Sequence, residues 1–212
     1  MSDMDSLVSG FRSYREKYMQ DTQGGYRGIA GYGPHSRILM IACCDSRADP
    51  AIITNSSAGE LMVIRNMANL VPAWSDAGAF QETAAALEFA VGYLQVEHIV
   101  VLGHSRCGGI RSLLTRLIDD IVPNRPLDNW MAVAEPAARR VLQEIPNASL
   151  DDQACACSRR ALLASLDNLQ EYPGVAQQVQ QGKLLLHGWY FNLASGQLES
   201  YDTSAAQFNN LL

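Results

Sequence analysis

The sequence predicts an α/β fold in which helices flank a mostly parallel central β-sheet, preceded by an amino-terminal helical arm. Apolar runs with little alternation occur at 38–43, 61–66 and 98–103, a pattern typical of parallel strands buried on both faces. The alanine-rich segment 78–96 is long enough for a crossover helix between the second and third runs. We therefore expect a right-handed βαβ unit at the centre of the sheet.

The amino-terminal segment 5–20 predicts an amphipathic helix, because its apolar residues recur at helical spacing. A glycine-rich connector at 22–36 follows it. We expect residues 1–22 to form a helical arm on a single domain that spans 1–212. The apolar residues of the helix are Leu7, Val8, Phe11, Tyr14 and Tyr18.

The second half of the chain predicts further helices and a final pair of strands. Segment 108–118 is expected to be helical. Residues 128–172 have a helical pattern, with interruptions at Pro136 and at a turn where Asn147 or Ser149 caps the next helix. The last two strands are expected within 182–193 and 196–202, separated by Ala-Ser-Gly.

Composition excludes several classes of function. The 212 residues are 48% hydrophobic, as in ordinary globular proteins, and carry a net charge of −6 without a run of Lys or Arg. This argues against nucleic-acid or membrane partners and favours a small-molecule substrate. The acidic amino terminus has no continuous apolar core like that of a secretory signal, so we expect a soluble, cytoplasmic protein.

Cysteine usage indicates a metal site or a catalytic site. The odd count of five fits a disulfide framework poorly. Two of them, Cys43 and Cys44, end the first predicted strand, and His104 and Cys107 follow the third in a His-x-x-Cys spacing. Ligands collect beyond the carboxyl ends of parallel strands. If these strands are neighbours, Cys43, His104 and Cys107 converge and give Zn²⁺ three protein ligands with an open fourth position.

Strand geometry distinguishes the paired cysteines. Residues two apart on an extended segment point the same way, so Cys43, Asp45 and Arg47 share one side, and Cys44 is expected to be a buried neighbour on the other. Zinc activates water at neutral pH. Asp45 lies close to the predicted metal, and Arg47 is placed to keep its carboxylate ionised and oriented.

These motifs resemble the β-carbonic anhydrases. The resemblance rests on Cys-x-Asp-Ser-Arg at 43–47, Arg-Asn-x-x-Asn-x-Val-Pro at 65–72 and Gly-His-x-x-Cys-Gly-Gly at 103–109, in the family's order. It implies a carbonate dehydratase, a zinc lyase that reversibly hydrates carbon dioxide to bicarbonate and a proton by zinc-bound hydroxide. It also implies one Zn²⁺ per subunit, a catalytic dyad of Asp45 and Arg47, and homodimers that exchange amino-terminal helices and pair into tetramers.

The predicted substrate pocket consists of Met62, Met67, Phe80 and Gly108. This chain departs from the family there: many relatives have an aromatic residue where Met62 stands and a Tyr where Phe80 aligns. Arg65 and Asn66 are expected to organise the loop beside the site.

Two alternatives share the predicted metal. A Met-rich wall of Met40, Met62 and Met67 suits a zinc hydrolase of carbonyl sulfide or carbon disulfide, although Met is also an ordinary gap-filler. A non-catalytic zinc-binding module is the second alternative, with Asp45 closing the fourth zinc position.

Overall fold

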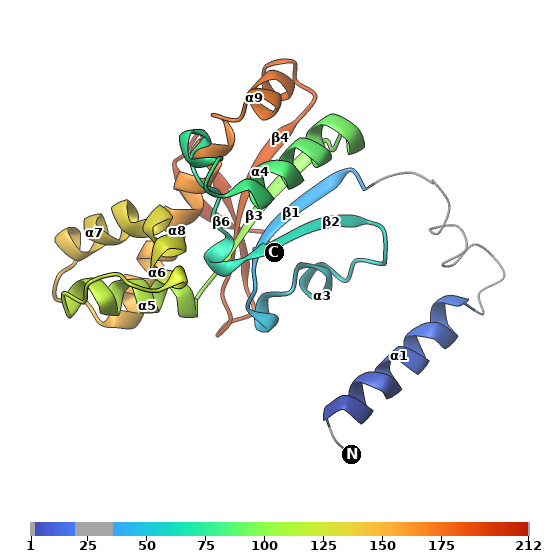
Figure 1. The fold of residues 1–212 in the computed structure, drawn as a ribbon, viewed down its shortest axis with the longest axis horizontal. Coiled ribbons are helices and arrows are strands. Elements are labelled where there is room, and N and C mark those ends of the chain that lie inside the picture. Colours follow the sequence, from blue (N-terminus) through green and yellow to red (C-terminus); the bar gives the residue numbers. More distant parts are fainter. Residues whose placement is uncertain (1–2, 20–35, 212) are drawn as a thin grey trace.

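A computed structural model describes residues 3–19 and 36–211. Its centre is a six-stranded sheet in the order β2-β1-β3-β4-β5-β6 (Figure 1). The strands are β1 (Ile38–Cys43), β2 (Leu61–Asn66), β3 (His98–His104), β4 (Leu185–Phe191), β5 (Leu198–Asp202) and β6 (Gln207–Asn210). The predicted connector at 22–36 lies almost wholly outside the described residues.

The parallel part of the sheet confirms the expected neighbours. β1 pairs in parallel with β2 on one side and with β3 on the other, and β3 pairs in parallel with β4. Only the last two pairings, β4 with β5 and β5 with β6, are antiparallel. Since parallel strands end at one edge, the residues that follow β1 and β3 meet there.

The helices follow the predicted segments closely. Alanine-rich α4 continues into a π-helical turn, Phe89–Leu94, which completes the crossover from β2 to β3. Ser149 is the cap before the longest helix, where its hydroxyl accepts from the Asp152 backbone N–H. The helices are α1 (Asp3–Met19), α3 (Pro50–Thr54), α4 (Gln81–Glu88), α5 (Gly108–Ile118), α6 (Pro126–Met131), α7 (Glu135–Glu144), α8 (Leu150–Leu169) and α9 (Pro173–Gln180).

The core lies on both faces of the sheet because alternate residues of β1 and β3 point to opposite sides. Leu39 and Ile41 pack into a cluster that includes residues of α4, α8 and α9. Met40 and Ala42 pack into a smaller cluster on the other face. A third cluster joins α5, α6, α7 and α8 beside the carboxyl ends of the strands.

Three elements were missed from the sequence. Helix α3 lies between β1 and β2, where no helix was predicted. Helix α9 begins with Pro173, at the end of the segment expected to be helical, and β6 follows a four-residue turn after β5. The expectation of a single domain over 1–212 stays a prediction. Among the described helices, none is long and apolar enough to cross a membrane.

Candidate metal centre

Three predicted ligands meet where β1 and β3 end. The ligand atoms of Cys43, His104 and Cys107 lie within 4.8 Å of one another, and all three residues are buried. The two Sγ atoms are 3.9 Å apart. Cys43 is the last residue of β1, and His104 is the last of β3, so the parallel pairing of these strands brings them together.

The turn after β3 orients the imidazole. Nδ1 of His104 lies 2.9 Å from the carbonyl oxygen of Ser105, an acceptor that requires Nδ1 to carry the proton. Ser105 is itself fixed, because its backbone N–H donates to the carbonyl of Phe191 at the end of β4. Nε2 of His104 is buried and has no hydrogen-bond partner among the described residues. Its lone pair is therefore available to a metal.

The surroundings of Cys43 favour a thiolate. A hydrogen bond from the Cys107 thiol is the main cause of the lowered pKa of Cys43. The backbone N–H of Ala68 also donates to Cys43 Sγ, at 3.3 Å. Ala68 reaches it from a left-handed conformation with φ of 64°. A thiol that loses its proton readily is the form that binds metal.

Asp45 and Arg47 form a bidentate pair beside the thiols. Arg47 donates from Nε and Nη2 to the two carboxylate oxygens, at 3.0 and 2.7 Å. These hydrogen bonds are the main reason that the pKa of Asp45 falls to about 2. Arg47 Nη2 also donates to the backbone carbonyl of Arg106, at 3.3 Å. The pair is thus fixed to the loop that carries two of the three ligands.

Arg65 holds the turn that follows β1, in keeping with the expectation that it organises the loop beside the site. Its Nε donates to the carbonyl of Cys43 at 2.7 Å, and its Nη2 donates to the carbonyl of Asp45 at 2.9 Å. The third nitrogen, Nη1, pairs with the Asp49 carboxylate. One guanidinium therefore holds the backbone on both sides of Cys44.

Asn66 organises the turn after β2. Its side chain donates to the carbonyl of Leu70 and accepts from the Leu70 N–H, both at 2.9 Å. This closed turn contains Ala68 and Asn69, which both have positive φ. Arg65 and Asn66 were predicted from the sequence to organise this loop. The pairing of Asp49 with Arg65 and the hydrogen bond from the Ala68 N–H to Cys43 Sγ were not predicted.

A cavity of about 250 Å³ opens beside the cluster. It is lined by Cys43, Cys44, Asp45, Met67, Gly108, Gly109 and Leu127. Gly109 allows a close approach, because a Cβ there would lie 2.7 Å from Cγ of Met67. Two of the four predicted pocket residues, Met67 and Gly108, are therefore placed at the site.

The other two predicted pocket residues lie farther away. Phe80 packs edge-on against Trp130, with ring centroids 5.1 Å apart. Trp130 lines a neighbouring cavity of about 350 Å³, which shares Met67 and Leu127 with the first. Met62 packs against the main core cluster and lines neither cavity.

Comparison with known proteins decides the family. A family model described as carbonic anhydrase matches residues 38–198. A carbonic anhydrase of Synechocystis is 34% identical over 94% of this chain and 71% of its own length. Beta carbonic anhydrase 3 of Arabidopsis thaliana is 32% identical over 94% of this chain and 77% of its own. The chain belongs to the β-carbonic anhydrase family.

Solved β-carbonic anhydrases share the whole fold. The structure of CcaA superposes with a TM-score of 0.88 at 33% identity, over 99% of this chain and 100% of that one. A β-carbonic anhydrase from Sordaria macrospora, described as tetrameric, has the same fold with a TM-score of 0.81 at 24% identity, over 94% and 97% of the two chains.

The donor set fits the zinc of β-carbonic anhydrases. Two thiolates bound to one tetrahedral Zn²⁺ at ~2.3 Å lie about 3.8 Å apart, close to the observed 3.9 Å between Cys43 and Cys107. Nε2 of His104, which has no hydrogen-bond partner in the described part of the chain, supplies the third ligand atom. Cys43, His104 and Cys107 would therefore hold the ion.

The expectation that Cys44 is buried is wrong. Its side chain is exposed and lines the cavity, whereas Cys43 is buried. β1 ends at Cys43, so Cys44 lies in the turn that follows the strand, where its side chain is not packed into the core. The alternation of side chains along an extended segment still predicts correctly which cysteine is the ligand, since only Cys43 of the two belongs to the cluster.

Proposed function

We propose that the chain is a zinc-dependent carbonic anhydrase that reversibly hydrates carbon dioxide to bicarbonate and a proton. The observation that carries this proposal is that Asp45, held by Arg47, lines the same cavity as Cys43. A purely structural zinc site does not require an ionised, oriented carboxylate at an open cavity. Family membership supports the same conclusion.

Zinc, when bound, supplies a Lewis acid that makes water nucleophilic at neutral pH. The residues of the chain orient the reaction. Asp45 stays ionised because of Arg47, so its free lone pairs accept a hydrogen bond from the attacking water and fix the direction of the oxygen lone pair. One C–O bond forms, one C=O π bond opens, and the proton that water loses leaves to solvent.

The walls of the cavity suit a small apolar substrate. Met67 and Leu127 provide apolar surface, while Gly108 and Gly109 present no side chain beyond Cα. Carbon dioxide has no charge or hydrogen-bond donor, so it enters such a space without leaving a polar group unsatisfied. Bicarbonate is charged and leaves toward water.

Stopped-flow measurement of carbon dioxide hydration, together with a zinc count, tests the proposal. We expect zinc-loaded protein to accelerate hydration well above the buffer rate and the Cys107→Ser variant to show neither zinc nor acceleration. Zinc-replete protein with no acceleration between pH 7 and 9 would contradict it and would favour a non-catalytic zinc-binding module. In that module Asp45 would be the fourth zinc ligand. Its pairing with Arg47 opposes this, because the carboxylate is already held by the guanidinium.

The carbonyl sulfide or carbon disulfide alternative loses part of its basis. Of the three methionines expected in the wall, Met67 alone lines the cavity at the thiols. Met40 and Met62 belong to core clusters. Hydrogen sulfide release from either substrate, at a rate above that of carbon dioxide hydration, would restore it.

For the assembly, we propose a homodimer that can pair into a tetramer. Figure 1 shows α1 apart from the sheet and its helices. Leu7 is 66% exposed and Phe11 is 61% exposed, so the apolar stripe of α1 faces water in a single copy. Burying such side chains is worth roughly 1.5–3 kcal/mol each, which favours a second copy as the cover.

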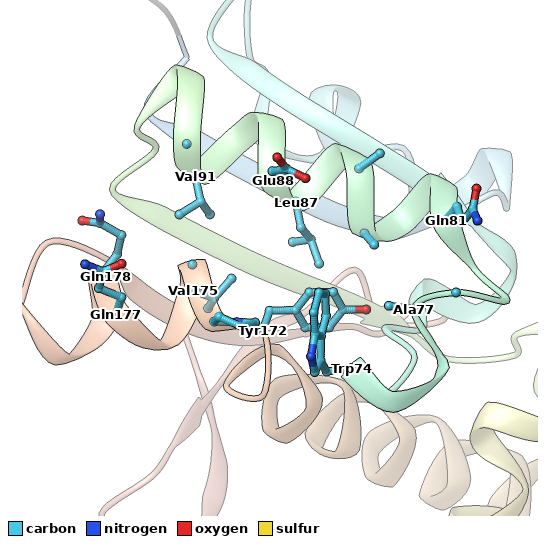
Figure 2. Close-up of a pocket in the computed structure, with 16 residues that line it drawn as sticks. Trp74, Ala77, Gln81, Leu87, Glu88, Val91, Tyr172, Val175, Gln177 and Gln178 are labelled. Carbon is cyan, nitrogen blue, oxygen red and sulfur yellow. The ribbon is translucent and has the colours of Figure 1, made fainter.

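A groove on the same molecule offers a complementary surface. It has a volume of about 630 Å³ and lies between α4 and α9, where Leu87, Val91, Trp74 and Tyr172 face it (Figure 2). Glu88 lines its rim, and α1 carries Arg12 and Arg15 beside its apolar stripe. An arm from a second copy would cover both apolar surfaces at once.

We also propose a cytoplasmic location. The five cysteines are free, and metal binding by Cys43 and Cys107 requires both to stay reduced. The cytosol keeps thiols in that state. Fluorescence microscopy of the tagged full chain in its source cell tests this, and export into an oxidising compartment would contradict it.

A further inference from the structure

A second polar cavity lies along α5, from its first turn to the segment that follows the helix. It has a volume of about 410 Å³ and is lined by Gly108, Arg111, Ser112, Thr115, Arg116, Ile121 and Arg125. Gly108 also lines the cavity at the thiols, so the two spaces are neighbours. Its lining contains three guanidinium groups and no carboxylate.

Each guanidinium is held by a carboxylate outside the lining. Arg111 pairs with Asp151 of α8, and Arg125 pairs with Asp128 of α6. An arginine has five N–H donors. The pair with Asp128 uses Nε and Nη2 of Arg125, and the pair with Asp151 uses Nη1 of Arg111. These pairs position the two arginines, and each arginine keeps further N–H donors that a ligand could use.

Arg116 provides an independent sign that a ligand belongs here. It is only 6% exposed, and its Nη2 donates to Glu135 at 2.6 Å. Its Nε is buried and has no hydrogen-bond partner among the described residues. Leaving a buried charged donor unsatisfied costs on the order of 1–3 kcal/mol or more. Arg116 also lines the cavity, so a small rotation of its side chain would bring this donor to an acceptor there.

The lining defines the chemistry of that acceptor. Three guanidiniums select an oxyanion, because planar arginine groups match carboxylate, carbonate and phosphate oxygens. The hydroxyls of Ser112 and Thr115 add further donors on the same side of α5. We propose that this cavity binds a compact oxyanion, of the bicarbonate or phosphate type, at a site separate from the zinc ligands.

Calorimetric titration of the zinc-loaded protein tests this proposal. Bicarbonate and phosphate are titrated separately at constant ionic strength set with chloride, so that the tighter anion identifies the source. The test variants are Thr115→Glu, which places a carboxylate among the guanidiniums at an exposed helix position, and Arg111→Gln. The control is Arg140→Gln, which also breaks an exposed pair, with Glu144, but lies outside the cavity.

We expect saturable binding of at least one of the two anions by the parent protein and by Arg140→Gln. Both test variants should bind that anion roughly tenfold or more weakly, as loss of a charge-assisted hydrogen bond predicts. Binding that is equal in parent and test variants would place the anion elsewhere, including at the zinc, and would overturn the proposal. Absence of saturable binding by the parent, or equal weakening in Arg140→Gln, would also overturn it. Turnover is not needed for this measurement, so failure here leaves the proposed hydration untouched.

Discussion

The Arg47 side chain donates hydrogen bonds to both carboxylate oxygens of Asp45, and its backbone N–H donates to the same carboxylate at 3.0 Å. Three donors from one residue therefore fix a carboxylate that stands next to a metal ligand. A carboxylate without them would be free to turn toward the ion. The pair keeps Asp45 available to substrate water.

We expect Arg47→Ala to retain zinc and lose most of its turnover. Without Arg47, the Asp45 carboxylate would be free to turn toward a bound zinc, and loss of a preorganised group of this kind costs about a hundredfold or more in rate. Zinc analysis and stopped-flow hydration measure both effects. Arg140→Ala is the matched control, since it removes an exposed, ion-paired arginine far along the chain. A near-parental rate in Arg47→Ala would make the pair purely structural.

The pKa of Asp45 should report the same pair. Its folded value of about 2 lies below the ordinary 3.8, so the contribution of the pair to the free energy of unfolding is fully present above about pH 4. That contribution is lost as pH falls through 2. Arg47→Ala should raise the pKa of Asp45 toward its ordinary value, as read from carboxyl carbon NMR shifts. An unchanged pKa would mean that a group other than the Arg47 side chain lowers the pKa of Asp45.

Zinc content should depend on Cys43 but not on Cys44. Cys43→Ser and Cys107→Ser remove donors of the buried cluster and should lose the metal, whereas Cys44→Ser changes an exposed side chain and should keep close to one Zn²⁺ per subunit. Elemental analysis after dialysis against a weak chelator measures this. Metal loss from Cys44→Ser with retention in Cys43→Ser would reverse the assignment of ligands.

Arg65→Lys should weaken zinc binding without removing a ligand. Lysine cannot reproduce the three-way contact with the carbonyls of Cys43 and Asp45 and the carboxylate of Asp49. Groups that orient metal ligands typically contribute ~10–100-fold in affinity or activity. Competition with a chromophoric chelator measures the change, and Arg37→Lys, at an exposed pair, is the control. Equal zinc affinities in Arg65→Lys and the parent protein would show that the backbone from Cys43 to Asp45 keeps its shape without Arg65.

Deleting residues 1–22 should break the dimer and lower activity together. The deletion removes the apolar stripe of α1 that we assign to a second copy. Sedimentation velocity and hydration kinetics on the same sample test it. A milder variant, Ala85→Arg in the groove between α4 and α9, should weaken the dimer while leaving α1 in place. A full-length protein that is monomeric and fully active would refute this assembly.

Local pattern predicts most of the sheet. The apolar runs that became β1 and β3 have few polar residues because both faces of these strands are buried. The expectation of burial on both faces is wrong for β2, which lies at the edge of the sheet and is only partly buried. The four-residue β6, Gln207–Asn210, was missed because it is polar and forms by pairing with β5 at the sheet edge. A short strand of that kind has no periodicity of its own.

By itself, the sequence predicted the three metal ligands and the pairing of Asp45 with Arg47, because residue type and spacing at strand ends restrict which side chains can converge. The tertiary structure decided what surrounds them. The hydrogen bond from the Ala68 N–H to Cys43 Sγ and those from Arg65 to the carbonyls of Cys43 and Asp45 join residues from different elements. The exposure of Cys44 also depends on the tertiary structure, because it follows from the end of β1 at Cys43. Such contacts depend on how elements pack, which spacing along one segment does not record.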